Sequence, residues 1–256
     1  MSNDRLRAVR VEERAGALWL SLERPPLNIL DLPTIREITD VLMRLSGRRD
    51  LKVLVLRSAV GGVFSAGVEV RDHARDRVGL MLGAFHALFR LLDGLPLATV
   101  AAVDGHCLGG GCELASFCDV VLATSRSSFG QPEIDVGCFP PVAASLLPRL
   151  VGRAAFEIVL SGAPIAASEA ARIGLVTRVV DDLDGETEAC VARLAGKSRA
   201  VLAVARKALR HGRDEGFHEA LAHNERLYRE DLTATEDIEE GVRAFLEKRA
   251  PRWRDG

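Results

Sequence analysis

The sequence predicts an α/β fold followed by an all-helical C-terminal part. Strand-like and helical patterns alternate over the first two-thirds of the chain, whereas every pattern after about Ala166 is helical. The chain has 256 residues, of which 48% are hydrophobic, which is close to the average for globular proteins. We therefore expect a main domain at residues 1–195 and a helical region at residues 196–256.

The N-terminal patterns supply the strands and helices of the α/β part. Leu6–Glu12 and Ala17–Leu22 alternate apolar and polar residues around a turn, as a β-hairpin does. Asp31 is a suitable N-cap for a helix that ends at about Arg44, and a second amphipathic helix is predicted at Val78–Leu92. Buried strands are predicted at Leu51–Leu56, Pro96–Val103 and Val120–Ala123. The C-terminal helices are predicted at Ser168–Gly174, Gly185–Gly196, Arg199–His211, Gly216–Glu230 and Thr235–Arg249.

Composition excludes several classes of protein. The formal charge is −2, from 34 basic and 36 acidic residues, so no broad electrostatic attraction to nucleic acid is expected. No apolar run reaches the roughly 18 residues that span a bilayer, and Met1–Arg14 has no secretory pattern. The five cysteines form no CxxC pair, which favours reduced thiols over disulfides or a metal site. We expect a cytoplasmic protein without a membrane partner or a bound metal.

Two glycine-rich segments stand out as candidate binding loops. They are Phe64–Val70 (FSAGVEV) and Gly105–Leu114 (GHCLGGGCEL), and the three glycines are expected directly after the strand ending at Val103. Small residues let a ligand approach the backbone, and free N–H groups at the start of a helix favour a developing oxyanion. Glu113 falls in the first turn of that helix. Tight structural turns are the alternative, although three glycines without a purpose cost about 1 kcal/mol each. A nucleotide loop is disfavoured because no GxGxxG in a βαβ context and no GxxxxGK[ST] occurs.

These segments resemble the crotonase (enoyl-CoA hydratase) superfamily. FSAGVEV and GHCLGGGCELA resemble its two oxyanion-hole segments, and Phe129–Ile134 (FGQPEI) resembles the segment of its second catalytic glutamate. Residues 161–176 and 240–249 resemble its downstream signatures, and the similarity runs from about Val9 to the end. The resemblance implies a spiral of ββα units followed by a helical trimerisation region, with trimers or hexamers built from two trimers. It also implies an acyl-CoA substrate and no separate cofactor.

The resemblance assigns roles to four residues. The N–H groups of Val68 and Gly110 would stabilise the enolate of the thioester, with about 3–4 kcal/mol per donor. Glu113 and Glu133 would activate water and deliver a proton, since two close carboxylates tend to separate their pKa values. The presence of both glutamates favours a hydratase over an isomerase that uses one.

Five further residues are expected near the substrate: Ala66, Arg71, His73, Pro141 and Lys248. Arg71 matches a basic position near the pyrophosphate of coenzyme A, and Lys248 would reach its 3′-phosphate, from a neighbouring subunit if not its own. A solvated helix end is the competing interpretation for Lys248. His73 would line the acyl pocket, or it is a loop histidine without a catalytic duty.

One loop departs from the common hydratase pattern. Common hydratases continue after the second glutamate with G-x-x-P-G-x-G-G-T, whereas this chain has Gly137–Ser145 (GCFPPVAAS). Pro141 replaces a glycine and has no backbone N–H. The stretch FPPVAASLLPRLVG and the segment SAGVEVRDH are most similar to cyclohexa-1,5-diene-1-carbonyl-CoA hydratases, which form 6-hydroxycyclohex-1-ene-1-carbonyl-CoA. The alternatives are a general enoyl-CoA hydratase, a 3-methylglutaconyl-CoA-type hydratase, or a non-enzymatic acyl-CoA- or RNA-binding relative.

Overall fold

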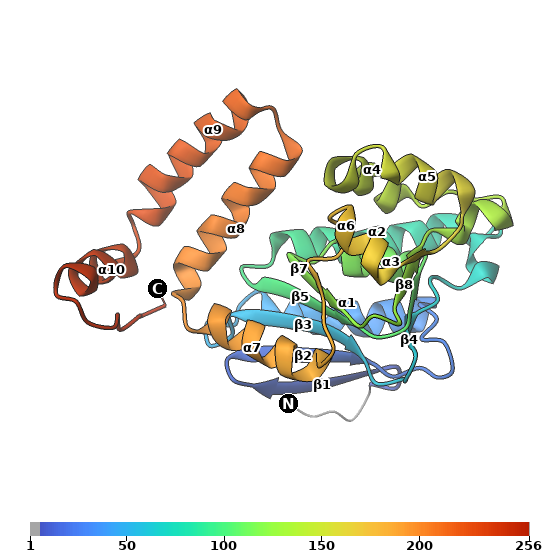
Figure 1. Ribbon diagram of the computed structural model, residues 1–256, viewed down its shortest axis with the longest axis horizontal. Helices are drawn as coiled ribbons and strands as arrows, with labels where there is room; N and C mark the ends of the chain where they lie inside the picture. The colour runs from blue at the N-terminus through green and yellow to red at the C-terminus, as the bar shows by residue number, and fades with distance from the viewer. Residues whose placement is uncertain (1–5, 256) are drawn as a thin grey trace.

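The computed structural model describes residues 6–255; residues 1–5 and 256, which the predicted domain limits include, lie outside that range. Two sheets form its centre (Figure 1). The larger sheet contains, in spatial order, β1 (Val9–Arg14), β2 (Ala17–Leu22), β3 (Val53–Ser58), β5 (Ala98–Val103), β7 (Val120–Ala123) and β10 (Arg178–Val179). The smaller sheet contains β4 (Val63–Ser65), β6 (His106–Leu108), β8 (Ser128–Gly130) and β9 (Ile165–Ala166). Pairing is parallel except at β1–β2 and β8–β9.

A repeated ββα unit builds both sheets. Three strands of the larger sheet are each followed by a short strand of the smaller sheet and then by a helix: β3 and β4 precede α2 (Val78–Gly94), β5 and β6 precede α3 (Gly110–Ser116), and β7 and β8 precede α4 (Pro141–Val151). Successive turns stack so closely that a Cβ at Gly105 would lie 1.9 Å from the carbonyl oxygen of Gly62. The predicted α/β spiral is confirmed.

The N-terminal hairpin and first helix follow their local sequence signals. Ala15 and Gly16 have φ values of 52° and 72°, so they form the two-residue turn typical of tight hairpins. The hairpin strand begins at Val9 rather than at the predicted Leu6. Helix α1 (Leu32–Leu45) begins at the predicted N-cap, where Asp31 accepts a hydrogen bond of 3.0 Å from the N–H of Thr34.

The larger sheet is buried on both faces. Leu18 and Leu20 of β2 point into the main core, which contains the apolar faces of α1 and α2. Trp19, between them, points to the opposite face and packs with Cys190 and Val191 of α7 (Leu183–Ala195). The alternation of side chains along a strand therefore divides this part of the molecule into two apolar layers.

The C-terminal region is all-helical, as predicted. It contains α8 (Arg199–Asp214), α9 (Phe217–Arg226), a π-helical turn (Leu227–Leu232) and α10 (Glu236–Leu246). The predicted boundary at 195/196 falls between α7 and α8, and Figure 1 shows α8 and α9 as a hairpin that projects from the core.

Arg206 attaches this hairpin to the core. Its guanidinium donates to Asp119 over 2.7 Å and to the carbonyl oxygens of Leu92 and Leu95 over 2.9 and 2.7 Å. These carbonyls belong to the C-terminal end of α2, where a cation is favoured. The buried side chain of Arg206 therefore holds α8 against the end of α2.

Several elements differ from the prediction. The glycine run does not follow β5 directly, because β6 lies between them. Helices α4 and α5 (Ala154–Ser161) were not predicted; α6 (Ala167–Arg172) was. The last helix ends at Leu246 rather than at Arg249, and Lys248 has a φ of 54°. Within residues 6–255, no helix combines the length and apolar character needed to cross a membrane.

Candidate active site

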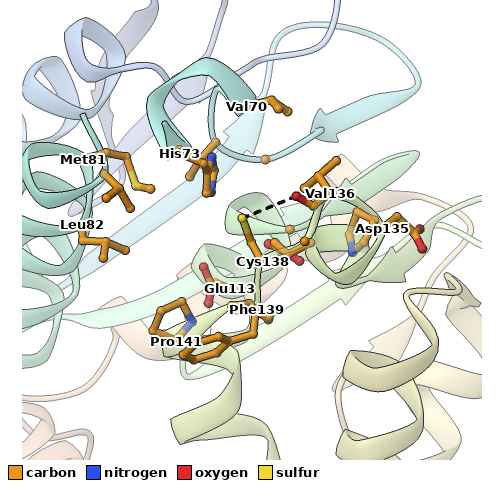
Figure 2. A pocket seen from close by; sticks show the side chains of 18 of the residues that line it. Val70, His73, Met81, Leu82, Glu113, Asp135, Val136, Cys138, Phe139 and Pro141 are labelled. Atoms are coloured by element: carbon orange, nitrogen blue, oxygen red, sulfur yellow. Dashed lines mark hydrogen bonds between the residues drawn. The ribbon is translucent and has the colours of Figure 1, made fainter. Parts of the chain in front are cut away.

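A cavity of about 470 Å³ lies where the two glycine-rich segments meet α2 and the loop before α4 (Figure 2). Its lining includes six residues singled out in the sequence: Ala66, Val68, His73, Glu113, Glu133 and Pro141. Gly110 lies directly behind Val68, since a Cβ at Gly110 would be 2.7 Å from Cγ2 of Val68. Arg71 and Lys248 are exposed and do not line the cavity. The structure thus brings together all the sequence-predicted residues except these two.

The two glycine-rich segments run side by side. A Cβ at Gly67 would lie 3.3 Å from the backbone nitrogen of Gly110, and Gly67 and Gly109 have φ values of 102° and 51°. Both conformations favour glycine. Across residues 6–255, the N–H groups of Val68 and Gly110 donate no hydrogen bond. The backbone therefore presents two unused donors beside the cavity.

Glu113 enters the cavity from the first turn of α3. It is only 3% exposed, and its Oε1 accepts a hydrogen bond of 2.7 Å from the N–H of Ala143. Burial raises the pKa of Glu113 to about 8, and the charge of Glu133 acts in the same direction. The hydrogen bond from Ala143 opposes this shift in the pKa only partly.

Glu133 enters from a short 3₁₀ helix, Pro132–Val136, on the other side of the glycines. A Cβ at Gly109 would lie 2.7 Å from Oε1 of Glu133, so only a glycine at position 109 leaves room for this carboxylate. Its Oε2 is buried without a hydrogen-bond partner among the described residues. Burial raises the pKa of Glu133 to about 7.

Comparison with known proteins decides the family. The sequence model described as "Enoyl-CoA hydratase/isomerase" matches residues 12–256.

This chain belongs to the enoyl-CoA hydratase/isomerase family.

Named relatives and solved structures agree with this assignment. The chain is 37% identical, over 94% of each chain, to the cyclohexa-1,5-dienecarbonyl-CoA hydratase of Thauera aromatica. It is 36% identical, over 96% of each chain, to a probable enoyl-CoA hydratase of Mycobacterium tuberculosis. The crystal structure of an enoyl-CoA hydratase from Bacillus anthracis superposes with a TM-score of 0.92 at 27% identity, covering 98% of this chain and 100% of that one. The protein is an enzyme of the hydratase (hydro-lyase) type and has the crotonase fold.

The rest of the cavity of this hydratase-family enzyme is largely apolar. Met81 and Leu82 of α2 form one wall, and Phe139 and Pro141 form another, with His73 across the cavity from them (Figure 2). His73 is held by a contact of 3.2 Å between its Nδ1 and the carbonyl oxygen of Glu69. Of the described lining residues none is lysine or arginine. The carboxylates therefore have no lysine or arginine partner to offset the burial that raises the pKa of both groups.

Sequence reasoning missed several lining residues. Val70, Met81, Leu82, Cys138 and Phe139 were not singled out. The Sγ of Cys138 donates to the carbonyl oxygen of Val136 over 3.8 Å, which the dashed line in Figure 2 marks. A usable signal was present for Met81 and Leu82, because they belong to the predicted amphipathic helix that follows the first glycine-rich segment.

Proposed function

We propose that this enzyme adds water reversibly to a conjugated, unsaturated acyl-CoA through Glu113 and Glu133. One observation carries the proposal: two carboxyl groups with raised pKa values line one apolar cavity beside the unused N–H groups of Val68 and Gly110. Such donors stabilise negative charge that develops on a thioester oxygen.

The pKa values suit an acid and a base. With values of about 7 and 8, the pair holds about one proton near pH 7.5. The ionised carboxylate takes a proton from a water molecule while the oxygen of that water bonds to the carbon β to the thioester. The electron pair moves to the thioester oxygen, and the protonated member then supplies the proton that completes the addition.

We propose cyclohexa-1,5-diene-1-carbonyl-CoA as the substrate. The oxygen of water would bond to the ring carbon β to the carbonyl, and the proton would return at the far end of the diene, which gives 6-hydroxycyclohex-1-ene-1-carbonyl-CoA. The similarity to the Thauera enzyme supports this substrate. The cavity supports it as well, since Phe139, Pro140 and Pro141 offer flat apolar surface to a ring.

A linear enoyl-CoA is the second candidate, because relatives such as the Mycobacterium tuberculosis protein carry the name of general enoyl-CoA hydratases. A 3-methylglutaconyl-type substrate is less well supported. Its second carboxylate needs a cationic partner, and His73 is the one basic side chain among the described residues that line the cavity.

We further propose that coenzyme A is bound with help from Ala66, Arg71 and Lys248, and that the enzyme is a trimer or a pair of trimers in the cytoplasm. Lys248 lies beyond α10, away from the cavity, so its contact with the 3′-phosphate would be made in a neighbouring subunit. Exposed apolar side chains on the C-terminal helices support association: Leu209, Phe217, Phe245 and Leu246. Sedimentation equilibrium tests the trimer, and a monomer at micromolar concentration would contradict it.

A side-by-side hydration assay tests the reaction and the substrate. The specificity constant kcat/KM is measured for cyclohexa-1,5-diene-1-carbonyl-CoA and for crotonyl-CoA, with products identified by mass, and Glu113→Gln serves as the inactive control. Preference for the cyclic diene supports the proposed substrate, and preference for crotonyl-CoA supports the linear alternative. Inactivity on both, with binding of the thioesters retained, would contradict both substrate assignments and favour an acyl-CoA-binding role.

A further inference from the structure

A second cluster of chemically active side chains lies far along the chain from the active site. His211 lies in the last turn of α8, Glu215 follows that helix, and His223 lies in α9. The N–H of Glu215 donates to the carbonyl oxygen of His211 over 2.9 Å, so both residues lie at the C-terminal end of α8, and the hairpin returns His223 to that end. One ligand atom from each residue lies within 4.8 Å of the others.

We propose that His211, Glu215 and His223 form a binding site for Zn²⁺ or a similar transition-metal cation. Two imidazoles and one carboxylate are a ligand set that zinc takes in proteins, with a water in the fourth position. In a tetrahedral site, ligand atoms lie about 3.3 Å apart. Small rotations of the side chains therefore close the cluster around an ion. A bound metal was not expected from the sequence, because the cysteine pattern offers no metal site and the two histidines and the glutamate come together only in the folded hairpin.

The hydrogen bonding of the cluster supports the proposal. Nδ1 of His223 lies 2.6 Å from Oε2 of Glu215, and the rings of His211 and His223 meet edge to face with centroids 5.0 Å apart. A metal-free hydrogen bond that joins the two helices would account for the contact between His223 and Glu215. It would leave Nδ1 of His211 buried without a hydrogen-bond partner, as it is among the described residues. Buried polar atoms without a partner are uncommon and often mark a missing ion or water.

A cavity gives a cation access to the cluster, and the basic side chains that line this cavity are paired with carboxylates. His211 and Glu215 line a cavity of about 540 Å³ that also contains three acidic and three basic side chains: Asp93, Asp214, Asp231, Arg206, Lys207 and Arg210. Each basic group is paired, Arg206 with Asp119, Lys207 with Asp231 and Arg210 with Asp93. A divalent cation can therefore reach the cluster without facing an unpaired cation.

Coordination would join α8 to α9. A metal bound by the folded hairpin and not by the unfolded chain stabilises the hairpin by mass action.

The test uses the full-length enzyme without an affinity tag, stripped of metal by a chelator and titrated with Co²⁺. One Co²⁺ per chain should bind with the visible absorption of a tetrahedral site, and Zn²⁺ should displace it. Zn²⁺ should also raise the Tm by about 5 °C at saturation. His223→Ala and His211→Ala should each weaken binding about 100-fold or more. His218→Ala, which removes an exposed histidine of α9, should leave binding unchanged.

The outcomes separate this proposal from the proposed function. All three variants lie outside the catalytic cavity, so hydration activity and circular dichroism report whether they fold. The proposal is overturned if wild-type protein shows no stoichiometric tetrahedral spectrum. It is overturned equally if His223→Ala, folded and active, binds Co²⁺ as tightly as the His218→Ala control.

Discussion

The backbone N–H of Ala143 donates a hydrogen bond of 2.7 Å to Oε1 of Glu113. Ala143 is the third residue of α4, so its N–H is one of the first-turn donors that have no partner within the helix. Pro141 begins the same helix and lacks an N–H, which costs nothing at that position. The loop that departs from the common hydratase pattern therefore orients a carboxylate of the candidate site.

Glu113→Gln and Glu133→Gln should each lower kcat for hydration by about 100-fold or more, because an amide neither accepts nor supplies the proton. Circular dichroism should show an unchanged fold. Glu157→Gln, which alters an exposed glutamate of α5, is the matched control and should retain full activity. Full activity in either active-site variant would contradict the two-carboxylate mechanism.

The rate of hydration should show a bell-shaped dependence on pH. Below about pH 7 both carboxyl groups are protonated and no base remains, whereas above about pH 8 both are ionised and no acid remains. The profile of kcat/KM for the free enzyme should therefore peak between these values. A rate that stays constant from pH 5 to pH 10 would show that the pair does not titrate as described.

Folding stability should fall as the pH rises from about 4.5 toward 8. The folded-state pKa of Glu113 is about 8 against an ordinary value of 4.5, so the native protein binds more protons than the unfolded chain across this window. The resulting loss is roughly 2–4 kcal/mol. Urea unfolding of Glu113→Gln at one fixed protein concentration should show a smaller decline between pH 6 and pH 8. An identical decline in the wild type and the variant would exclude Glu113 as the source.

Gly110→Ala should lower kcat about 10-fold or more. The added Cβ would lie 2.7 Å from Cγ2 of Val68 and 2.8 Å from Cζ of Phe85, so the two segments that carry the backbone donors are pushed apart unless these side chains shift. Gly83→Ala is the control, because a Cβ at Gly83 of α2 meets nothing within 4 Å. The control should retain activity and gain up to about 1 kcal/mol of helix stability. Equal activities of the two variants would argue against an oxyanion contact at Gly110.

Elements with strong local signals could be predicted from the sequence. Asp31 caps α1 as expected, and Val120–Ala123 is a strand with the predicted limits. The strands of the smaller sheet were missed because β4, β6 and β8 have three residues each, too few to show a period. Helix α4 was missed because it contains prolines, of which Pro148 lies inside it.

In the candidate site too, residues in distinctive local segments could be predicted, and features that depend on tertiary packing could not. Glu113 and Glu133 could be found because each lies in a distinctive local segment. The helix that carries Met81 could be predicted, but its position opposite Phe139 in one cavity could not, since tertiary packing alone brings these two residues together. Desolvation, which governs the pKa of both glutamates, is likewise a property of the folded surroundings and not of the motif.

Through its contact with Arg206, α2 connects the C-terminal hairpin to the wall of the cavity. Met81 and Leu82, in its first half, form a wall of the cavity, and its 17 residues span about 25 Å to the carbonyls that Arg206 holds. Arg206 therefore ties α8, none of whose residues lines the cavity, to a helix that does.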